Sequence, residues 1–166
     1  MSKNPVAIAA VTLAVVVVAW LLVPESEEHR IRQRLHELAE IISATQHQRG
    51  TARLVHVTGL RQFFTGDVTV HIGDGMPRVK DRDTLLQMAH VALQQEPALA
   101  VAFTDLSVTH DRGTPYARVN ATVVVTGVHT QQARSVDARE VEMDVVKTEG
   151  EWRIQSVRPV QVMKLD

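Results

Sequence analysis

An uninterrupted apolar run near the N-terminus constrains this chain more than any other feature of its sequence. Residues 6–23, VAIAAVTLAVVVVAWLLV, carry no charge and a single hydroxyl, that of Thr12. A helix of this length spans about 27 Å, close to the thickness of the hydrocarbon core of a bilayer. Trp20 lies near the end of the run, where an indole favours the headgroup level. The run, Val6 to Val23, therefore predicts one transmembrane helix behind a short tail, residues 1–5.

Two other interpretations of this run are open. A buried core helix can be apolar, but it is rarely so uniform over this length. A cleaved signal peptide could use Val17 and Ala19 as its small-residue cleavage site. Cleavage there would leave Trp20 and three aliphatic residues exposed at the new N-terminus. We therefore favour an uncleaved signal anchor.

The charges on the two sides of the run give opposing signals about its orientation. Lys3 lies on one side, whereas Arg30, Arg32 and Arg34 lie on the other, which slightly opposes a cytoplasmic N-terminus. The segment before the run, residues 1–5, is very short, however, and three glutamates closely follow the run. We predict a single-pass protein of a bacterial inner membrane with a cytoplasmic N-terminus. Its C-terminal domain, residues 25–166, would then be periplasmic or otherwise extracytoplasmic.

Composition excludes several classes of function. The formal net charge of −1 argues against a nucleic-acid-binding protein, which usually carries a basic face. The absence of cysteine removes disulfides, thiolate metal sites and cysteine nucleophiles. The eight histidines make no i, i+4 pair and no HExxH motif. The sequence therefore predicts no metal site and no cofactor.

Three stretches after the run show helical periodicity. Ser26, followed by two glutamates, is typical of a helix N-cap, and Ile31, Leu35 and Leu38 then recur on one face. Pro97 ends the last of the three stretches. We expect helices at about 26–47, 52–64 and from Asp81 or Asp83 to 96.

The remaining pattern has a period of two, which is typical of strands. In the longest stretch Ala117, Val119 and Ala121 share one face, and a change of parity after Phe103 predicts a bulge near Thr104 and Asp105. We expect strands at about 67–72, 99–108, 116–126, 140–145 and 152–163, with a polar connection at 127–138 and a hairpin turn at 149–150. This order favours an α+β domain: a curved, mostly antiparallel sheet with three helices on its concave side, preceded by the transmembrane helix.

This order of elements resembles the nuclear transport factor 2-like superfamily, also called SnoaL-like or cystatin-like. Members often end in a hairpin turn, then Gly-x-Trp-x-Ile and a final strand, which here is Gly150, Trp152 and Ile154. The segments FFTGDVTV and KDRDTLLQMAHVAL match the early strand and third helix of the group. The resemblance covers about residues 28–163 and implies a cone with a pocket between helices and sheet. The superfamily holds isomerases, cyclases, dehydratases, transport factors and membrane-tethered assembly modules, so the fold does not choose a function.

The resemblance also shows where a catalytic acid would lie. In the ketosteroid isomerase branch, a carboxylate general base lies on the inward face at the end of the first strand. Strand parity assigns that position to Ile72, which cannot accept a proton. Asp74 has the same parity but falls in a turn between two glycines, so it is the remaining catalytic candidate. The only tyrosine, Tyr116, adjoins a turn and not the first helix. We therefore expect no catalytic residue.

Large apolar residues are expected to close the cone and to line any ligand pocket. These are Phe63, Ile72, Phe103, Met143 and Trp152. The outer face of the long strand is polar, and sheet faces of this kind form dimers in the superfamily. That face carries Arg118, Asn120 and Thr122.

The preferred hypothesis is a membrane-tethered, non-catalytic module that acts in protein–protein interaction or assembly at the membrane surface. Type IV secretion scaffold proteins resemble this plan, with one span before a periplasmic domain of this fold. The expected partner is another protein or a second copy of the chain. Binding of a small apolar molecule in the pocket is the alternative, and an isomerase-, dehydratase- or cyclase-like enzyme is a further one.

Overall fold

The computed structural model describes most of the chain that follows the apolar run. The predicted transmembrane run, residues 52–57 of the predicted second helix, Ile72 and Asp74 lie outside the described residues. Among the described helices, none combines the length and the hydrophobicity that crossing a bilayer demands. The described residues are 26–44, 58–71, 73, 78–95, 99–128 and 134–160.

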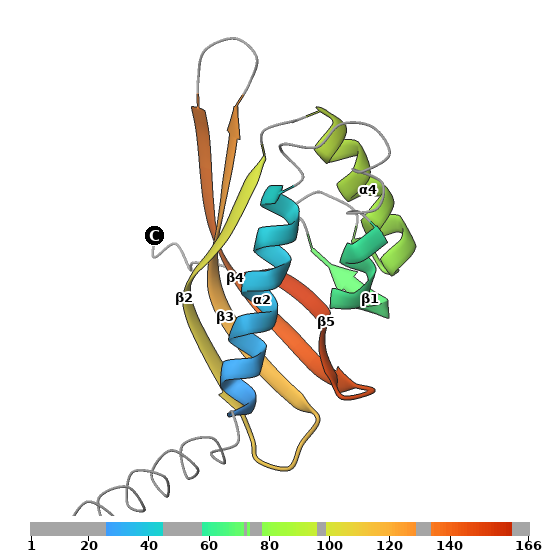
Figure 1. The fold of residues 1–166 in the computed structure, drawn as a ribbon, viewed down its shortest axis with the longest axis vertical. Helices are drawn as coiled ribbons and strands as arrows, with labels where there is room; N and C mark the ends of the chain where they lie inside the picture. Colours follow the sequence, from blue (N-terminus) through green and yellow to red (C-terminus); the bar gives the residue numbers. More distant parts are fainter. Residues whose placement is uncertain are drawn as a thin grey trace, which may run out of the picture.

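The described strands form one mixed sheet with the spatial order β1-β5-β4-β3-β2 (Figure 1). The four strands β2 to β5 pair antiparallel with their neighbours, and β1 joins the edge parallel to β5. The prediction of a mostly antiparallel sheet is therefore confirmed. The strands are β1 (Phe64–Val70), β2 (Ala100–His110), β3 (Tyr116–Val128), β4 (Arg134–Thr148) and β5 (Glu151–Pro159).

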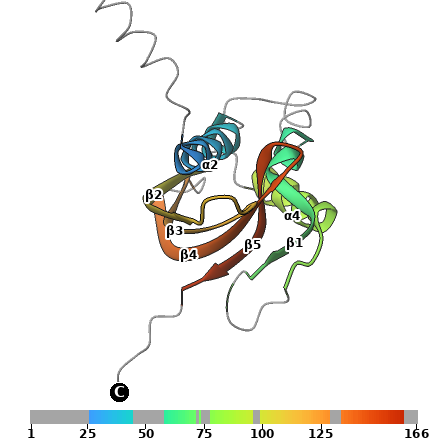
Figure 2. The same ribbon diagram turned by 90° about the horizontal axis from the view of Figure 1, so that it is seen from below.

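Two α-helices lie on the same side of this sheet. Helix α2 (Glu27–Ala44) runs across the concave face, and α4 (Arg82–Gln95) stands beside the β1 edge (Figures 1 and 2). The Ser26 hydroxyl accepts a hydrogen bond from the His29 amide at 3.2 Å and so caps α2 as the sequence predicts. Asp81 caps α4 by accepting the Thr84 amide at 2.7 Å, which decides between the two aspartates proposed for this role.

The described part of the chain holds two complete α-helices where three were predicted, and of the second predicted helix only Thr58 and Gly59 are α-helical among the described residues. The second predicted helix was to end at Phe64, but residues 60–63 form the short 3-10 helix η2 (Leu60–Phe63), and Phe64 already begins β1. Pairing of Phe64 with Ile154 gives this backbone hydrogen-bonding partners in the sheet that a longer helix would lose. Gly66 lies in β1 where the register with β5 shifts.

The core lies between α2 and the concave face of the sheet. Ile31 of α2, Val119 of β3 and Met143 of β4 are each at most 1% exposed. Ala117, Val119 and Ala121 are buried whereas Arg118 and Asn120 are exposed, so the predicted parity of the long strand is confirmed. Burial of this stripe fixes the face of the sheet that α2 covers.

Two features of the strands lie outside simple alternation. The predicted bulge is confirmed, because the β2–β3 register shifts between Thr104 and Ser107 and Asp105 has a φ of 52°. The predicted connection at 127–138 is mostly wrong, since β3 continues to Val128 and β4 begins at Arg134. These ends pair with each other, Val128 with Arg134. We call this extension, residues 124–128 and 134–138, the β3–β4 arm.

Candidate functional site

A cavity of about 220 Å³ lies between α2, α4 and the beginning of β2. Eleven described side chains line it, and all of them are apolar. Helix α2 contributes Leu38 and Ile42, and α4 contributes Leu86, Ala89 and Leu93 among others. The cavity is therefore walled by the side of α4 that faces the core and by the second half of α2.

Small side chains are among those that line the cavity from α4. Leu86, Ala89 and Leu93 recur at the spacing of one helical face, and Ala89 has the smallest side chain of the three. Protein interiors are otherwise packed closely, and dry cavities of about 150 Å³ with an aliphatic lining bind benzene. The space is thus large enough for a small apolar molecule.

A pair of hydrogen bonds fixes one wall of the cavity. The Ser43 hydroxyl donates to the Val101 carbonyl at 3.2 Å and accepts from the Val101 amide at 3.1 Å. These bonds join the end of α2 to the beginning of β2, directly beside Ile42 and Val101 of the lining. The wall on this side is therefore held in place by the backbone.

The described wall of the cavity offers no group for acid–base chemistry. No ionisable side chain of the described residues lines it. Asp74, the catalytic candidate of the sequence, lies outside the described residues, as does Ile72. The arrangement that the structure describes can exclude water and bind apolar surface, but it places no proton donor or acceptor beside a ligand.

The four described pocket residues expected from the sequence are not part of the cavity wall. Phe63, Met143 and Trp152 are at most 4% exposed and belong to the core cluster between α2 and the sheet, with Phe103 packed against it. None of these four lines the cavity. A hollow of about 10 Å³ touches Phe63 and Trp152, which is at most the space of one water molecule. The structure therefore brings these residues together as packed core.

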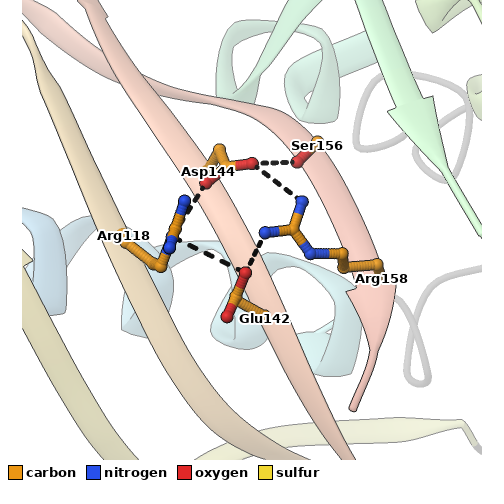
Figure 3. Close-up of polar contacts among 5 residues, drawn as sticks. All are labelled: Arg118, Glu142, Asp144, Ser156 and Arg158. Atoms are coloured by element: carbon orange, nitrogen blue, oxygen red, sulfur yellow. Dashed lines mark hydrogen bonds and ion pairs between the residues drawn. The ribbon is translucent and has the colours of Figure 1, made fainter. Parts of the chain in front are cut away.

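A network of charged side chains occupies the opposite face of the sheet (Figure 3). Arg118 of β3 contacts Asp144 of β4 at 3.3 Å and Glu142 at 3.6 Å. From β5, Arg158 contacts both acids, and the Ser156 hydroxyl donates to Asp144 at 2.8 Å. Cations and anions thus alternate across three strands.

Asp144 is the centre of this network, which we call the outer-face network. Burial by itself raises the pKa of Asp144, but the hydrogen bond from Ser156 and the charges of Arg158 and Arg118 outweigh burial and lower that pKa. The carboxylate is therefore ionised wherever the protein is folded near neutral pH. Asn120 and Thr122 of the predicted dimer face lie on the same face of β3 as Arg118, and both described helices lie on the other side of the sheet (Figure 2).

A second polar cluster joins the first turn of α2 to the end of the sheet. The Glu27 carboxylate accepts hydrogen bonds from Lys147 Nζ at 2.7 Å and from Trp152 Nε1 at 2.8 Å. These two hydrogen bonds lower the pKa of Glu27. The His110 ring meets the Trp152 ring edge-on, with centroids 5.5 Å apart. We call the contacts of Glu27 with Lys147 and Trp152 the Glu27 clamp.

The fold agrees with a sequence match to a known domain family, which covers most of the chain. A sequence profile of the SnoaL-like domain family matches residues 33–158. The chain belongs to the SnoaL-like domain family. No curated protein sequence matches it significantly. The resemblance seen in the order of elements is therefore confirmed.

Solved structures with the fold of this SnoaL-like domain carry different functional names. A Novosphingobium aromaticivorans protein provisionally named an aromatic ring hydroxylase is 16% identical, with a TM-score of 0.67 over 85% of this chain and 92% of its own. A provisionally named scytalone dehydratase of the same organism is 15% identical, with a TM-score of 0.62 over 81% and 85%.

A third structure, from Xanthomonas campestris, is provisionally named a calcium/calmodulin-dependent protein kinase II association domain. It is 8% identical, with a TM-score of 0.65 over 85% of this chain and 91% of its own. Identities this low show a shared fold alone. Because the three names describe different functions, the function of this SnoaL-like domain has to be argued from its own residues.

Proposed function

We propose that this SnoaL-like domain binds a small apolar ligand in the cavity between α2 and α4, without catalysing a reaction on it. The observation that carries the proposal is the apolar character of all eleven described side chains in the wall. A site built for acid–base catalysis needs ionisable groups beside the reacting atoms, and the described wall offers none. An apolar space instead favours binding of an apolar ligand, because binding removes apolar surface from water.

The size of the cavity limits the ligand and its affinity. A volume of about 220 Å³ suits a substituted ring or a chain of roughly eight carbons, given that about 150 Å³ accommodates benzene. Transfer of eight methylene groups is worth about 6 kcal/mol, from which the cost of immobilising the ligand is subtracted. If immobilisation costs about 2 kcal/mol, we expect a dissociation constant on the order of 1 mM for such a probe.

We further propose that residues 6–23 hold this domain at a membrane surface, with the domain on the extracytoplasmic side. The support is the length and uniform hydrophobicity of the run, and the beginning of α2 at Glu27, soon after the run ends. An apolar ligand partitions into lipid. A binding domain tethered at the bilayer therefore works where its ligand is concentrated.

The cavity can be tested by titrating the full chain in nanodiscs with 1-octanol or toluene and following the methyl resonances of the lining leucines. Ala89→Phe fills the cavity with a ring and should abolish the shifts. Gln87→Phe places the same ring on an exposed position of α4 and should leave them intact. The proposal fails if neither probe shifts these resonances, or if Ala89→Phe leaves the titration unchanged.

The outer-face network supports a second candidate, self-association of the chain through this side of the sheet. Arg118 and Arg158 alternate with Glu142 and Asp144, so the face carries equal numbers of cations and anions and can match a second copy of itself. In a chain without cysteine, Asn120→Cys provides a single attachment point for a bismaleimide. Dimer adducts in membranes from Asn120→Cys but not from Gln87→Cys would support this interface, and equal yields would exclude it.

A further inference from the structure

The Glu27 clamp makes the beginning of α2 one rigid body with one end of the sheet. Glu27 contacts Lys147 and Trp152 at 2.7 and 2.8 Å. The Lys147 amide in turn donates to the Pro115 carbonyl at 2.7 Å, which brings in the turn between β2 and β3. Because these contacts come from α2, β4, β5 and the β2–β3 turn, the chain enters the domain at a fixed place and in a fixed direction.

The β2–β3 turn is itself closed by hydrogen bonds. The Thr114 amide and hydroxyl both donate to the Asp111 carbonyl, at 3.1 and 2.9 Å, and His110 Nε2 donates to the Thr114 carbonyl at 3.0 Å. Gly113 has a φ of 86°, a conformation that favours glycine. The turn therefore presents a defined surface at this end of the domain.

The apolar run ends close to this surface in the sequence. Only residues 24–26 separate Val23 from Glu27, and four extended Cα–Cα steps reach at most about 14 Å. If the run crosses a bilayer, the clamped end of the domain must therefore lie within about that distance of the point where the run leaves the hydrocarbon.

We propose that the β2–β3 turn and Tyr116 lie against a phospholipid headgroup surface, and that the Glu27 clamp sets this orientation. The inference rests on the membrane tether proposed above. Arg112 is exposed and Tyr116 is 60% exposed, and both residue types are enriched at the headgroup level. Asp111 and Glu28 lie at the same end, so its charge is mixed. The tether, and not attraction to anionic lipid, therefore produces the contact.

This orientation places the β3–β4 arm far from the bilayer. In Figure 1 the arm extends from the end of the sheet opposite to the beginning of α2. From Thr148, beside the clamp, β4 runs twelve residues to Val136, which is roughly 40 Å of strand. Arg112 and Val136 are thus suitable near and far reporters of the domain's orientation, and both are exposed.

The absence of cysteine from the chain allows single-site labelling. The full chain with Arg112→Cys or Val136→Cys is labelled with bimane and reconstituted in phosphatidylcholine vesicles that carry a nitroxide on the headgroup. We expect quenching at position 112 to exceed that at position 136 by about three-fold or more. Position 136 lies at the far end of roughly 40 Å of strand that begins beside the clamp. Raising the salt concentration should change neither value, since the contact does not depend on net charge.

The inference is overturned if quenching is equal at the two positions, or stronger at position 136, in vesicles that still hold the chain after an alkaline carbonate wash. Loss of the chain from the vesicles in that wash would instead show that the tether has failed. The two failures are therefore distinguishable.

A clamp variant tests what sets the orientation. Glu27→Ala, made in both the Arg112→Cys and the Val136→Cys backgrounds, should bring the two quenching values closer together, whereas Glu28→Ala removes a neighbouring exposed glutamate and should not. Far-ultraviolet circular dichroism shows whether each variant is folded. If a folded Glu27→Ala protein keeps the full difference in quenching, the clamp does not set the orientation. If Glu27→Ala does not fold, Lys147→Met removes the other charge of the clamp. The difference in quenching between positions 112 and 136 is then measured in that variant.

Discussion

Trp152 donates its indole N–H to the Glu27 carboxylate over 2.8 Å, and this bond joins the last strand of the sheet to the first turn of α2 across 125 positions of the chain. The indole is 4% exposed and packs in the core cluster. The ring of Trp152 therefore packs in the core while its N–H binds Glu27. The same residue that the family resemblance marks as part of the closing hairpin thus also determines where the chain enters the domain.

Trp152→Phe separates these two roles, because phenylalanine keeps an aromatic ring but loses the hydrogen bond and some volume. We expect a loss of about 2–3 kcal/mol in the free energy of unfolding, the usual cost of removing a partner from a charged group in a packed site. Urea denaturation of the full chain in detergent measures it. Glu28→Ala, a surface change next to the clamp, should stay within about 0.5 kcal/mol of the wild type. A loss below that limit for Trp152→Phe would show that the bond contributes little.

The pH dependence of stability follows from the carboxylates whose pKa values the fold lowers, which are Glu27, Asp144 and the α4 cap Asp81 among the described residues. Each binds a proton less readily in the native state than in the unfolded chain. Acid therefore favours unfolding, and the stability that these groups contribute is complete above their unfolded pKa and lost as the pH falls through the native one. We expect the urea midpoint to fall between about pH 6 and pH 3. Glu27→Gln should make that fall shallower, and an unchanged slope would contradict the assignment.

The outer-face network should contribute little to the stability of a single chain. Arg118 is 57% exposed and Arg158 45% exposed in their side chains, so water screens their pairing with Asp144. We expect Asp144→Asn to cost about 0.5–1 kcal/mol in the free energy of unfolding, less at high salt. Thermal melts at low and high ionic strength measure the difference. A much larger cost that grows with protein concentration would instead indicate that this face is buried against a second copy.

Much of the fold could be predicted because local pattern and final environment agree. The stripe Ile31, Leu35 and Leu38 gave α2 and its buried face, and the change of parity after Phe103 gave the bulge. The predicted beginning of β1 was wrong, because Phe63 and Phe64 suit the end of a helix as well as a strand. Pairing of Phe64 with Ile154, 90 positions later, decides between the two. Such a long-range contact leaves no mark in a short sequence window.

The arm and the lining of the cavity could not be predicted, for different reasons. In the arm, polar side chains interrupt the alternation of apolar and polar residues that marks a strand in the sequence. Backbone pairing nevertheless continues the two strands as far as Val128 and Arg134. The cavity depends on which side chains α2, α4 and β2 bring to one wall, and the pattern assigns α4 an inward stripe without saying what lies opposite. The large apolar residues named from the sequence were natural candidates for a pocket, but their size fills the core between α2 and the sheet.

The last prediction distinguishes the cavity from ordinary core. Leu93→Ala removes a lining side chain that is 4% exposed, and Met143→Ala removes one of similar burial in the sheet core, 1% exposed. Each should cost about 2–4 kcal/mol. Because Leu93→Ala enlarges a space that already accepts a ligand, 1-octanol at about ten times its dissociation constant should restore about 1 kcal/mol to it. Met143→Ala keeps the cavity and should gain only about as much as the wild type does at the same octanol concentration, and a gain for Leu93→Ala no larger than that of Met143→Ala would show that octanol does not fill the enlarged cavity.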